Sequence, residues 1–388
     1  MLVYRNSRYN KIVKILYTLN SGQPGGMEHH VLDLVEEMTK RGHEVFVWCK
    51  DGPLAQQFTN AGAKVIIAEI KLECDPQYIF NLIKFLKKEK IDVLHAHEIK
   101  AVANSMLAGF LSGTKVRISH THTPISEWKV PWYKKLLNLT TQFFVVWWFS
   151  NKEIALTQSR KLVKIKEWLF EWKLEVIPNG VRIEDFELND DTKKNFRNEI
   201  CARFNIPQNA FIFGNVGRIS QEKGHAALIE AFTKFLEKFP QTHLLLAGGG
   251  PLEDQIREKI KSLNLENKVT VTGRFTSEDQ KKYFGTPDCF VHPTLAEGFG
   301  IVALEAMASG LPLLVSDLDV LQEVCADTVI YFETGDSSDL LNKMEWVYKN
   351  PENLKILTTK AKQRVKELYS MQKFGDSYEQ LYMSIINL

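Results

Sequence analysis

Short apolar runs alternate with longer amphipathic stretches in the first half of the chain. The apolar runs are rich in valine and isoleucine and have the length of buried β-strands. Residues 28–39 are typical of the amphipathic stretches, with Val31, Leu34, Val35 and Met38 at the spacing of one helix face. The strands are expected at residues 11–18, 44–49, 64–68, 92–97, 116–120, 154–157 and 174–178. This alternation favours a parallel sheet with helices packed on it.

The same alternation starts again after a polar, acidic stretch at residues 184–209, which has no strand pattern and is expected to contain the linker. Further strands are expected at residues 211–217, 243–248, 268–273, 289–293 and 311–317, and closing helices at 338–349, 351–368 and 372–386. A chain of 388 residues exceeds the size at which a single core keeps growing. We therefore expect an α/β protein with two doubly wound parallel-sheet domains, at residues 1–183 and 184–371, and with ligand sites in the loops after the strands.

The composition is that of a folded globular protein, with 44% hydrophobic and 25% charged residues. The net charge of +2 excludes a protein that coats nucleic acid. The five cysteines are scattered and never form a CxxC pair, which argues against a disulfide framework and fits a reducing cytoplasm. The N-terminal segment is interpreted as a leader into the first strand, because Lys14 interrupts its apolar run. The longest apolar run, residues 143–149, is far shorter than the ~20 residues of a membrane-spanning helix. A cytoplasmic protein is expected.

Two of the predicted strand-to-helix loops carry residues suited to phosphate. Gly25 and Gly26 directly precede the first helix, where glycine lets a ligand approach the backbone and free N–H groups favour an anion, although a plain turn explains them equally well. Gly217 and Arg218 follow a later strand, and Lys223 lies five residues after Arg218. Two cations of different shape can hold a diphosphate and stabilise it as it leaves. Solvated surface charges are the alternative, which their position after a buried strand disfavours.

The most informative run is HPTLAEGFGIVALEAMASGLP, at residues 292–312. In it, Glu297 precedes a glycine-containing turn that feeds a helix whose first N–H groups can hold phosphate. Glu305 lies eight residues further on, about two helical turns if the helix begins at once. We expect Glu297 at the sugar and Glu305 at the ribose hydroxyls. Two solvated helix acids are the alternative, which the apolar residues around Glu305 disfavour.

Two histidine pairs, His95 with His97 and His120 with His122, each end a predicted strand. The spacing of two residues is interpreted as turning the rings of one pair to opposite faces of the strand. Such a pair would be a poor chelate, so no metal is expected. The role expected of His122 is that of a single imidazole that orients an acceptor hydroxyl or touches the phosphate. His95 is expected to be structural.

Residues 128–173 hold nine Lys or Arg against three Glu, together with six of the eight tryptophans of the chain. Tryptophan beside basic residues is typical of a surface that lies on anionic lipid. Leu162, Ile165, Leu169 and Trp172 also follow helical spacing, and a core-facing helix with a basic outer face is the alternative. Peripheral membrane contact through this stretch and a core-facing helix both remain open.

Together these motifs resemble glycosyltransferase family 4, a large family of retaining enzymes of the GT-B type with two Rossmann-like domains. The resemblance rests on GGMEHHVLDLVEEMTKRGHEV, HTH, VIPNGV, GRISQEKGH, LLLAGGGPL, VTGRF and EGFGIVALEAMASGLPLLVSD. Their order and spacing are highly specific and extend over nearly the whole chain.

The resemblance implies roles for individual residues. In the family, the residues matching Arg218 and Lys223 bind the donor diphosphate, and those matching Glu297 and Glu305 bind the donor sugar and the ribose. The residue matching His122 lies near the reaction centre, and the family needs no divalent cation or other cofactor. The candidate donor-binding residues are Gly26, Gly217, Arg218, Lys223, Arg274, Gly298, Phe299, Gly300, Ile301 and Glu305, and the candidate catalytic residues are His122 and Glu297.

The resemblance further implies that the last helix, at residues 372–388, packs back on the first domain. The expected function is transfer of a hexose-type sugar from a nucleotide-sugar, with UDP favoured over GDP, to a glycan or lipid-linked acceptor in polysaccharide or glycoconjugate synthesis. A sugar-nucleotide epimerase of the same architecture is one alternative, and it would convert the donor without an acceptor. A catalytically silent sugar-nucleotide-binding protein is another, which the complete set of cations and acids disfavours. None of these functions involves nucleic acid.

Overall fold

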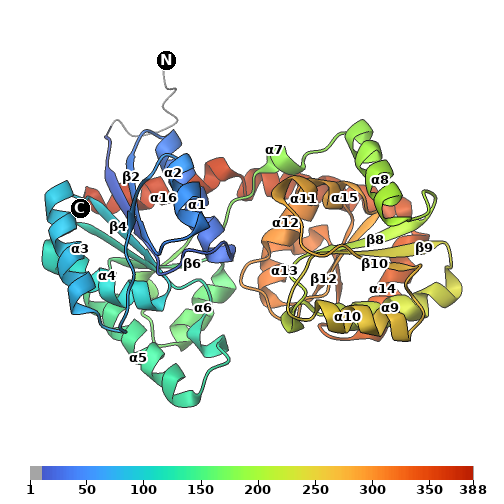
Figure 1. Cartoon of the computed structure of the whole chain (residues 1–388), viewed down its shortest axis with the longest axis horizontal. Helices are drawn as coiled ribbons and strands as arrows, with labels where there is room; N and C mark the ends of the chain where they lie inside the picture. Colours follow the sequence, from blue (N-terminus) through green and yellow to red (C-terminus); the bar gives the residue numbers. More distant parts are fainter. Residues whose placement is uncertain (1–10, 388) are drawn as a thin grey trace. The chain divides into compact units, whose positions relative to one another are not determined.

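The chain folds into two compact units, each built on its own sheet (Figure 1). The structure, a computed structural model, describes residues 11–387. The first unit contains the described residues up to Gly180 and those from Met371 onward, and the second is Val181–Ser370. The chain therefore leaves the first unit at Gly180, where the sequence pattern predicts a boundary after residue 183, and returns to it for the last helix.

The first unit has a seven-stranded sheet in the order β3-β2-β1-β4-β5-β6-β7, with every neighbouring pair parallel. The strands are β1 Lys14–Thr18, β2 Glu44–Cys49, β3 Lys64–Ile67, β4 Val93–His97, β5 Val116–His120, β6 Lys152–Ala155 and β7 Leu174–Val176. Each lies on a predicted strand. β6 ends before the predicted residue 157 because the Thr157 hydroxyl caps helix α6 by accepting from the Arg160 N–H.

Helices cover both faces of this sheet, and a hydrophobic cluster fills the space on each side. The helices are α1 Gly26–Lys40, α2 Pro53–Asn60, α3 Pro76–Glu89, α4 Ile99–Ser112, α5 Trp132–Trp148, α6 Gln158–Lys166 and α16 Met371–Ile386. The predicted apolar face of α1 is confirmed, since Val31, Leu34, Val35 and Met38 are all fully buried.

The last helix, α16, is held to α1 by apolar packing and by a buried cluster of charges. Phe374 and Tyr378 of α16 belong to the same hydrophobic cluster as α1. Arg41, at the end of α1, lies 3.1 Å from an Asp376 carboxylate oxygen, and His43 lies 3.0 Å from a Glu379 carboxylate oxygen. Removing one partner from such a buried cluster leaves an uncompensated charge, so α16 is an integral part of the first unit.

The second unit has a six-stranded parallel sheet in the order β10-β9-β8-β11-β12-β13. The strands are β8 Phe211–Val216, β9 Thr242–Ala247, β10 Val269–Val271, β11 Cys289–His292, β12 Leu313–Ser316 and β13 Ile330–Phe332. The first five were predicted. The sixth, β13, has only three residues, two of them partly exposed, so it leaves no apolar run in the sequence.

The helices of the second unit are α7 Ile183–Phe186, α8 Asp190–Phe204, α9 His225–Lys238, α10 Glu253–Ser262, α11 Ser277–Gly285, α12 Ile301–Ala308, α13 Asp319–Cys325, α14 Ser337–Lys349 and α15 Pro351–Leu368. The stretch expected to contain the linker holds α8, capped by the Asn189 side chain, which accepts from the Thr192 N–H. Only Ile200 and Cys201 of this helix are buried, which explains its polar sequence. No helix in residues 11–387 is long and apolar enough to cross a membrane.

In both sheets the strand order reverses beside the first strand, between β1 and β4 and between β8 and β11. Parallel doubly wound sheets bind ligands at the carboxyl ends of the strands at such a reversal. Each unit therefore has one edge at which ligand-binding residues are expected.

Candidate functional site

In the second unit, the loops after β8 and β11 meet at the reversal of strand order. The loop after β8 contains a short 3₁₀ helix, Gln221–Lys223, and the loop after β11 leads to α12. The Glu222 carbonyl accepts from the Thr294 hydroxyl at 3.0 Å and from the Leu295 N–H at 2.7 Å. These bonds tie the predicted diphosphate loop to the predicted sugar loop.

Glu297 lies between a cation and an imidazole. Its Oε2 is 2.8 Å from Lys223 Nζ and 3.2 Å from His292 Nε2, and its Oε1 accepts from the Gly298 N–H at 3.2 Å. Burial opposes the ionisation of Glu297, but the His292 ring and the Lys223 ammonium outweigh it and hold the pKa of the carboxyl well below its usual range. Glu297 is thus an anion that can accept hydrogen bonds from hydroxyl groups.

Two glycines allow these loops to come together. Gly224 has φ +67°, and a Cβ there would lie 1.8 Å from the Pro293 carbonyl oxygen in the other loop. Gly300 caps α12 with φ +99°, and a Cβ there would lie 2.7 Å from a Leu321 methyl carbon. Side chains are excluded at both positions by backbone conformation and by space.

The helix α12 starts at Ile301, three residues later than a helix starting directly after Glu297 would. Its first turn therefore points free N–H groups at the glycine turn of Gly298 and Gly300. Glu305 lies on the second turn, 9% exposed, and one of its oxygens accepts from Gln280 Nε2 of α11 at 3.1 Å. The alternative of a solvated acid is wrong for Glu305, and its buried carboxylate can accept from ribose hydroxyls.

The remaining predicted donor residues differ in exposure. Arg218 is exposed, and in residues 11–387 it has no hydrogen bond or ion pair. Arg274, after β10, is also exposed and lies against Gly249, where a Cβ would come within 2.7 Å of its Cγ. Phe299, in contrast, is 3% exposed and its ring packs against Tyr369 at 6.0 Å, so only its backbone can meet a ligand.

Two polar residues in this site have no counterpart in the sequence-based predictions. His292 closes β11 and contacts Glu297, and His225, the first residue of α9, places Nε2 3.1 Å from Asn215 Oδ1. Burial lowers the pKa of His225 to about 4, so its ring is neutral. A histidine at the end of a buried strand directly before proline was the available signal for His292.

In the first unit, the strand-end histidines lie on one side of the sheet, and the expectation of opposite faces is wrong. Residues two apart in a strand point to the same face. The rings of His95 and His97 stack at 4.2 Å, and those of His120 and His122 at 3.8 Å. His97 Nδ1 lies 3.1 Å from His122 Nε2, and His30 of α1 meets the His120 ring at 4.8 Å.

A buried ion pair between Lys164 and Glu153 holds the backbone of the segment that carries His120 and His122. The Thr121 N–H donates to a Glu153 carboxylate oxygen at 2.9 Å, and Lys164 Nζ donates to the Thr121 carbonyl at 2.8 Å. The backbone between the two histidines is therefore held on both sides.

Burial keeps the histidines of this site neutral. Desolvation lowers the pKa of His30 to about 4 and holds the pKa values of His97, His120 and His122 well below their usual range. His95 is fully buried and its Nδ1 lies 2.8 Å from the Tyr382 hydroxyl of α16, in keeping with a structural role.

At the start of α1, Gly26 is exposed and a Cβ there would meet nothing within 4 Å. The preceding Gly25 is extended and caps the helix without a side-chain hydrogen bond. A Cβ on Gly25 would lie 2.5 Å from a Glu28 carboxylate oxygen, so an acidic side chain already reaches this end of α1, and phosphate binding there stays a prediction.

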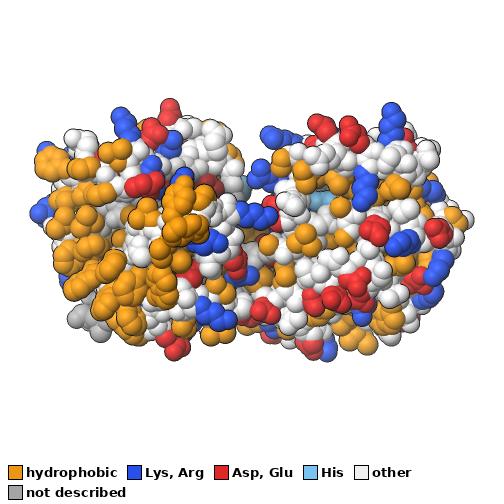
Figure 2. Space-filling view, turned by 90° about the horizontal axis from the view of Figure 1, so that it is seen from below, with side chains coloured by type: hydrophobic (Ala, Val, Ile, Leu, Met, Phe, Trp, Pro, Cys, Tyr) orange, Lys and Arg blue, Asp and Glu red, His pale blue; other side chains and the backbone are white. Residues whose placement is uncertain are grey.

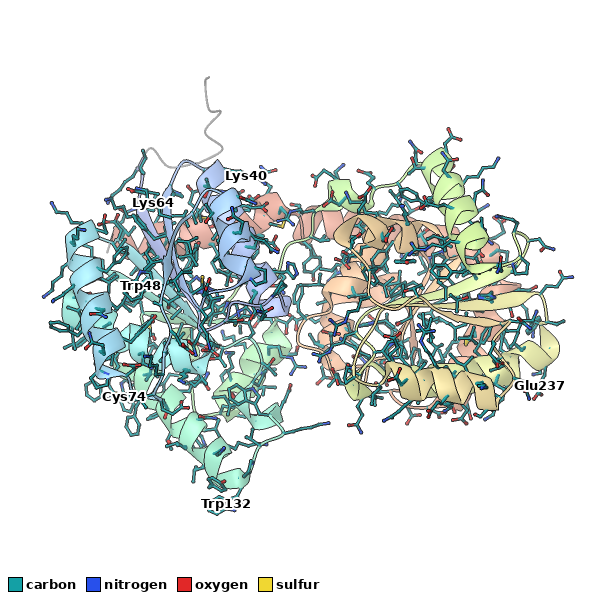
Figure 3. All side chains as sticks on the ribbon, in the orientation of Figure 1. Lys40, Trp48, Lys64, Cys74, Trp132 and Glu237 are labelled. Carbon is teal, nitrogen blue, oxygen red and sulfur yellow. The ribbon has the colours of Figure 1, made fainter. Side chains whose placement is uncertain are left out.

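The surface around α5 carries many exposed apolar side chains, which Figure 2 shows gathered on the left of its view. Trp132 is 77% exposed and points away from the ribbon in Figure 3. We call this surface the aromatic face; it consists of Trp132, Tyr133, Leu136, Leu137, Phe144, Trp147, Trp148, Leu162, Trp168, Phe170 and Trp172. Because Leu162 and Trp172 are 59% and 61% exposed, the alternative of a core-facing helix is wrong for them, whereas Leu169 is buried.

Two family models match almost the whole chain. The model described as "Glycosyltransferase Family 4" matches residues 24–185, and the model described as "Glycosyl transferases group 1" matches residues 196–364. The chain belongs to glycosyltransferase family 4. The resemblance inferred from the motifs is confirmed, and the protein is a glycosyltransferase.

Two relatives of this glycosyltransferase have names that give a lipid or a lipid-linked sugar as substrate. It is 29% identical over 322 residues to the phosphatidyl-myo-inositol mannosyltransferase of Mycobacterium tuberculosis, covering 78% of this chain and 77% of that protein. It is 24% identical over 372 residues to the UDP-Gal:alpha-D-GlcNAc-diphosphoundecaprenol alpha-1,3-galactosyltransferase of Escherichia coli, covering 93% and 94%.

The fold of the glycosyltransferase matches solved structures. The crystal structure of Anabaena HepE in complex with UDP and glucose superposes with a TM-score of 0.82 at 20% identity, covering 96% of this chain and all of that one. At this identity the match shows the fold, and the predicted GT-B architecture with two Rossmann-like parallel-sheet domains is confirmed.

Proposed function

We propose that this glycosyltransferase moves a hexose-type sugar from a nucleotide-sugar donor, with UDP favoured, and retains the anomeric configuration. The observation that carries the proposal is the contact of Lys223 and His292 with the Glu297 carboxylate, beside the free N–H groups of α12. This arrangement offers positive groups for a diphosphate next to an anion for sugar hydroxyls. The UDP-bound Anabaena structure of the same fold supports the choice of nucleotide.

Four groups hold the proposed donor, three at its diphosphate and one at its ribose. The side chains of Arg218 and Lys223 and the first N–H groups of α12 bind the diphosphate, and Glu305 accepts from the ribose hydroxyls. Each charge-assisted hydrogen bond contributes about 1.5–3 kcal/mol. As the bond to the sugar breaks, negative charge grows on the leaving diphosphate, where fixed cations stabilise the transition state more than the ground state. These cations replace a divalent metal in the proposed reaction.

Glu297 has two roles in the proposed reaction. Its anion orients the sugar through hydroxyl groups, and its pairing with Lys223 keeps the ammonium close to the diphosphate site. His122 is proposed to accept from or donate to the acceptor hydroxyl, which burial favours because it keeps the imidazole neutral. No protein nucleophile is assigned.

The proposed acceptor is a lipid-linked sugar or glycan at an anionic membrane surface. Both named relatives act on lipid-type acceptors. The aromatic face offers tryptophans beside basic side chains, a composition suited to the lipid headgroup region. A pocket next to α5 is lined largely by apolar side chains, including Ile99, Ala103, Leu107, Val145 and Phe149. This surface supports peripheral attachment at the cytoplasmic side of a membrane.

A sugar-nucleotide epimerase and a silent binding protein make different predictions from a transferase. An epimerase converts the donor with no acceptor present, and a silent protein binds donor without turnover. The Arg218→Ala, Lys223→Ala double variant tests the donor site itself by calorimetric titration with UDP, GDP and ADP in the presence of a chelator.

The proposal expects one nucleotide series to bind in chelator, and the double variant to lose at least ~100-fold in affinity. The matched control is Lys234→Ala, an exposed lysine paired only within α9 to Glu230, which should bind as the parent does. Equal affinity in the double variant would remove the proposed donor site. Donor consumption that requires an added lipid-linked acceptor would then separate the transferase from both alternatives.

A further inference from the structure

A pocket of about 270 Å³ lies in the first unit between α4, α5 and the loop after β3. Figure 1 shows α4 beside α5, and the two helices are in contact. Ala103 and Leu107 of α4 line the pocket together with Val145 and Phe149 of α5, and residues 73–74 line it from the loop. A concave apolar site with a few polar groups is the usual form of a small-ligand pocket. We call it the α4–α5 pocket.

One side of the pocket is polar and lies at the start of α4. Asn104 belongs to the lining, and its Nδ2 donates to the Glu73 carbonyl at 2.9 Å and to the Lys100 carbonyl at 2.8 Å. Lys100 Nζ in turn donates to the Lys71 carbonyl at 3.3 Å. These bonds hold the loop after β3 against the first turn of α4. The two lysines are therefore next to the polar side of the pocket.

The charge of these lysines is not compensated by an acid. Within residues 11–387, neither Lys71 nor Lys100 forms an ion pair. Of the acids nearby in the chain, Glu69 is paired with another lysine at 2.6 Å, and Glu73 is exposed and can turn to solvent. Burial raises the pKa of the Glu98 carboxyl and so favours its neutral form. Two ammonium groups without a carboxylate favour an anion such as phosphate.

The apolar part of the pocket is continuous with the aromatic face. Leu137 lines the pocket and also belongs to the aromatic face, where 60% of its side chain is exposed. The Phe149 ring lies 5.3 Å from the ring of Phe110, which is 51% exposed on the last turn of α4. Apolar side chains thus connect the pocket to the surface that is proposed to meet the lipid.

The pocket also begins beside the residues proposed to meet the acceptor. Ile99, the first residue of α4, lines the pocket and comes two residues after His97. His97 Nδ1 lies 3.1 Å from Nε2 of His122, the imidazole proposed at the acceptor hydroxyl. A ligand in the pocket with its polar group at the start of α4 would have that group on the side of the reacting hydroxyl.

The occupant that suits both parts of the pocket is a hydrocarbon chain carried on a phosphate. Apolar walls stabilise methylene groups removed from water, and the two lysines stabilise the phosphate. A volume of about 270 Å³ is just below the ~300–1,000 Å³ of pockets for drug-sized ligands. It therefore suits part of one chain and is too small for a segment of a partner protein.

We propose that the α4–α5 pocket binds the part of the acceptor's hydrocarbon chain that is nearest to its phosphate, with Lys71 and Lys100 at the phosphate. This inference rests on the proposed lipid-linked acceptor and assigns the site at which the enzyme recognises the lipid. Recognition of the acceptor then depends on its chain as well as on its sugar.

The test is calorimetric titration of the full chain with alkyl phosphates, from butyl to decyl phosphate, below their micelle concentrations and without nucleotide. The proposal expects affinity to rise up to ~4-fold for each added methylene, the equivalent of ~0.8 kcal/mol, and to level off once the pocket is full. Lys100→Ala should weaken decyl phosphate at least ~10-fold through loss of a charge-assisted bond. Inorganic phosphate should bind far more weakly than decyl phosphate.

Filling the pocket should remove the dependence on chain length. Ala103→Phe places a ring in the lining, and its affinity should be the same for butyl and decyl phosphate. The matched control is Ala202→Phe, at an exposed alanine of α8 in the second unit, which should bind as the parent does. Near-ultraviolet circular dichroism checks the fold of each variant, and Leu107→Trp replaces Ala103→Phe if that variant does not fold.

Cys74, labelled in Figure 3, shows where the alkyl phosphate binds. It lines the pocket and is exposed, whereas the other four cysteines of the chain are buried. At ten times the Kd of decyl phosphate, the reaction of Cys74 with a thiol reagent should slow about tenfold, because only about a tenth of the sites are empty. Ala103→Phe should abolish this protection.

Turnover connects the pocket to the acceptor. With a polyprenyl-diphosphate sugar as the acceptor, decyl phosphate should raise the KM for the acceptor and leave the KM for the donor unchanged. Inhibition that does not compete with the acceptor would assign the pocket to a bilayer lipid and overturn the proposal.

Two further outcomes would overturn it: an affinity that does not depend on chain length in the parent, or equal chain dependence in the parent and in Ala103→Phe. The second would place the alkyl chain on the aromatic face instead. The titrations contain no nucleotide, so their failure leaves the proposed donor site standing. Failure of UDP to bind would in turn leave the result of the alkyl phosphate titrations unaffected.

Discussion

At the strand ends of the second unit an ammonium, a carboxylate and an imidazole lie in contact, whereas at those of the first unit four neutral imidazoles converge. Both groups lie where a doubly wound sheet reverses its strand order. The difference arises from what surrounds them. Glu297 keeps its charge because Lys223 and His292 compensate for burial. Within residues 11–387, no carboxylate forms an ion pair with His30, His97, His120 or His122, and burial lowers their pKa values.

This difference shows how one architecture provides two kinds of site. Compensated charge suits a substrate that is itself charged, such as a diphosphate beside hydroxyl groups. Neutral nitrogens suit a ligand that needs lone pairs, such as a hydroxyl group. The predictions below alter one side of the comparison at a time.

The largest expected effect is that of Glu297→Gln. The amide keeps the size of the side chain but removes the charge that pairs with Lys223 and holds the sugar. Transfer should fall by ~100-fold or more, the cost of removing a transition-state electrostatic partner. Steady-state kcat with donor and a lipid-linked acceptor checks this, with Glu230→Gln on the surface of α9 as the matched control. An unchanged kcat would mean that the buried charge of Glu297 has no part in the reaction.

Acid should destabilise the first unit before the second. A histidine with a lowered folded pKa contributes stability that is complete above the unfolded pKa of about 6.5 and is lost as the pH falls toward the folded value. For His30, with a folded pKa of about 4, the loss is about 3 kcal/mol over this range. The first unit has five such histidines and the second has His225 and His243.

Tryptophan fluorescence can follow the first unit alone, because Trp346 is the only tryptophan of the sequence in Val181–Ser370. In a Trp346→Phe variant, urea unfolding followed by fluorescence and by circular dichroism should coincide at pH 7. At pH 5 the fluorescence transition should come first. Coincident transitions at both values would show that the buried histidines do not set the acid stability of the first unit.

Glu305→Gln should have a smaller effect, confined to nucleotide binding. Loss of an anionic acceptor for ribose hydroxyls should lower the affinity for UDP by ~10-fold. The loss should disappear when 2′,3′-dideoxy-UDP replaces UDP, because the hydroxyls that Glu305 is proposed to bind are then absent. An equal loss with both nucleotides would indicate a general effect on α12.

The smallest effect is expected at the aromatic face. Trp132→Ser with Trp148→Ser should weaken attachment to vesicles containing anionic lipid several-fold without changing UDP affinity. Trp346→Ser is the matched control, since Trp346 is 39% exposed but lies on α14 in the second unit. Vesicle co-sedimentation gives the comparison, and equal binding by all three proteins would contradict membrane contact through residues 128–173.

The strand positions were predictable because each buried parallel strand is a short apolar run that shows directly in the sequence. What the pattern missed has little buried surface: β13 has three residues, and α8 buries only Ile200 and Cys201. Strand ends shifted where a side chain caps the next helix, as Thr157 does, because a cap depends on one hydrogen bond and not on a run of residues.

The candidate site was predictable where its residues follow one another in a motif, as Glu297 and Glu305 do. Contacts made by the tertiary fold were not. His292 approaches Glu297 from the end of β11, and His30 reaches the strand-end histidines from α1. The histidine pairs were assigned to opposite faces of their strands. The two-residue period of a strand instead places residues two apart on the same face.

Hydrogen exchange of the metal-free protein, measured with and without saturating UDP in chelator, tests most directly whether the charged site of the second unit binds the donor. The account predicts the largest protection in residues 217–224 and 297–305, and its loss in Lys223→Ala. No protection, or protection centred elsewhere in the chain, would contradict the assignment of these loops to the donor diphosphate and ribose.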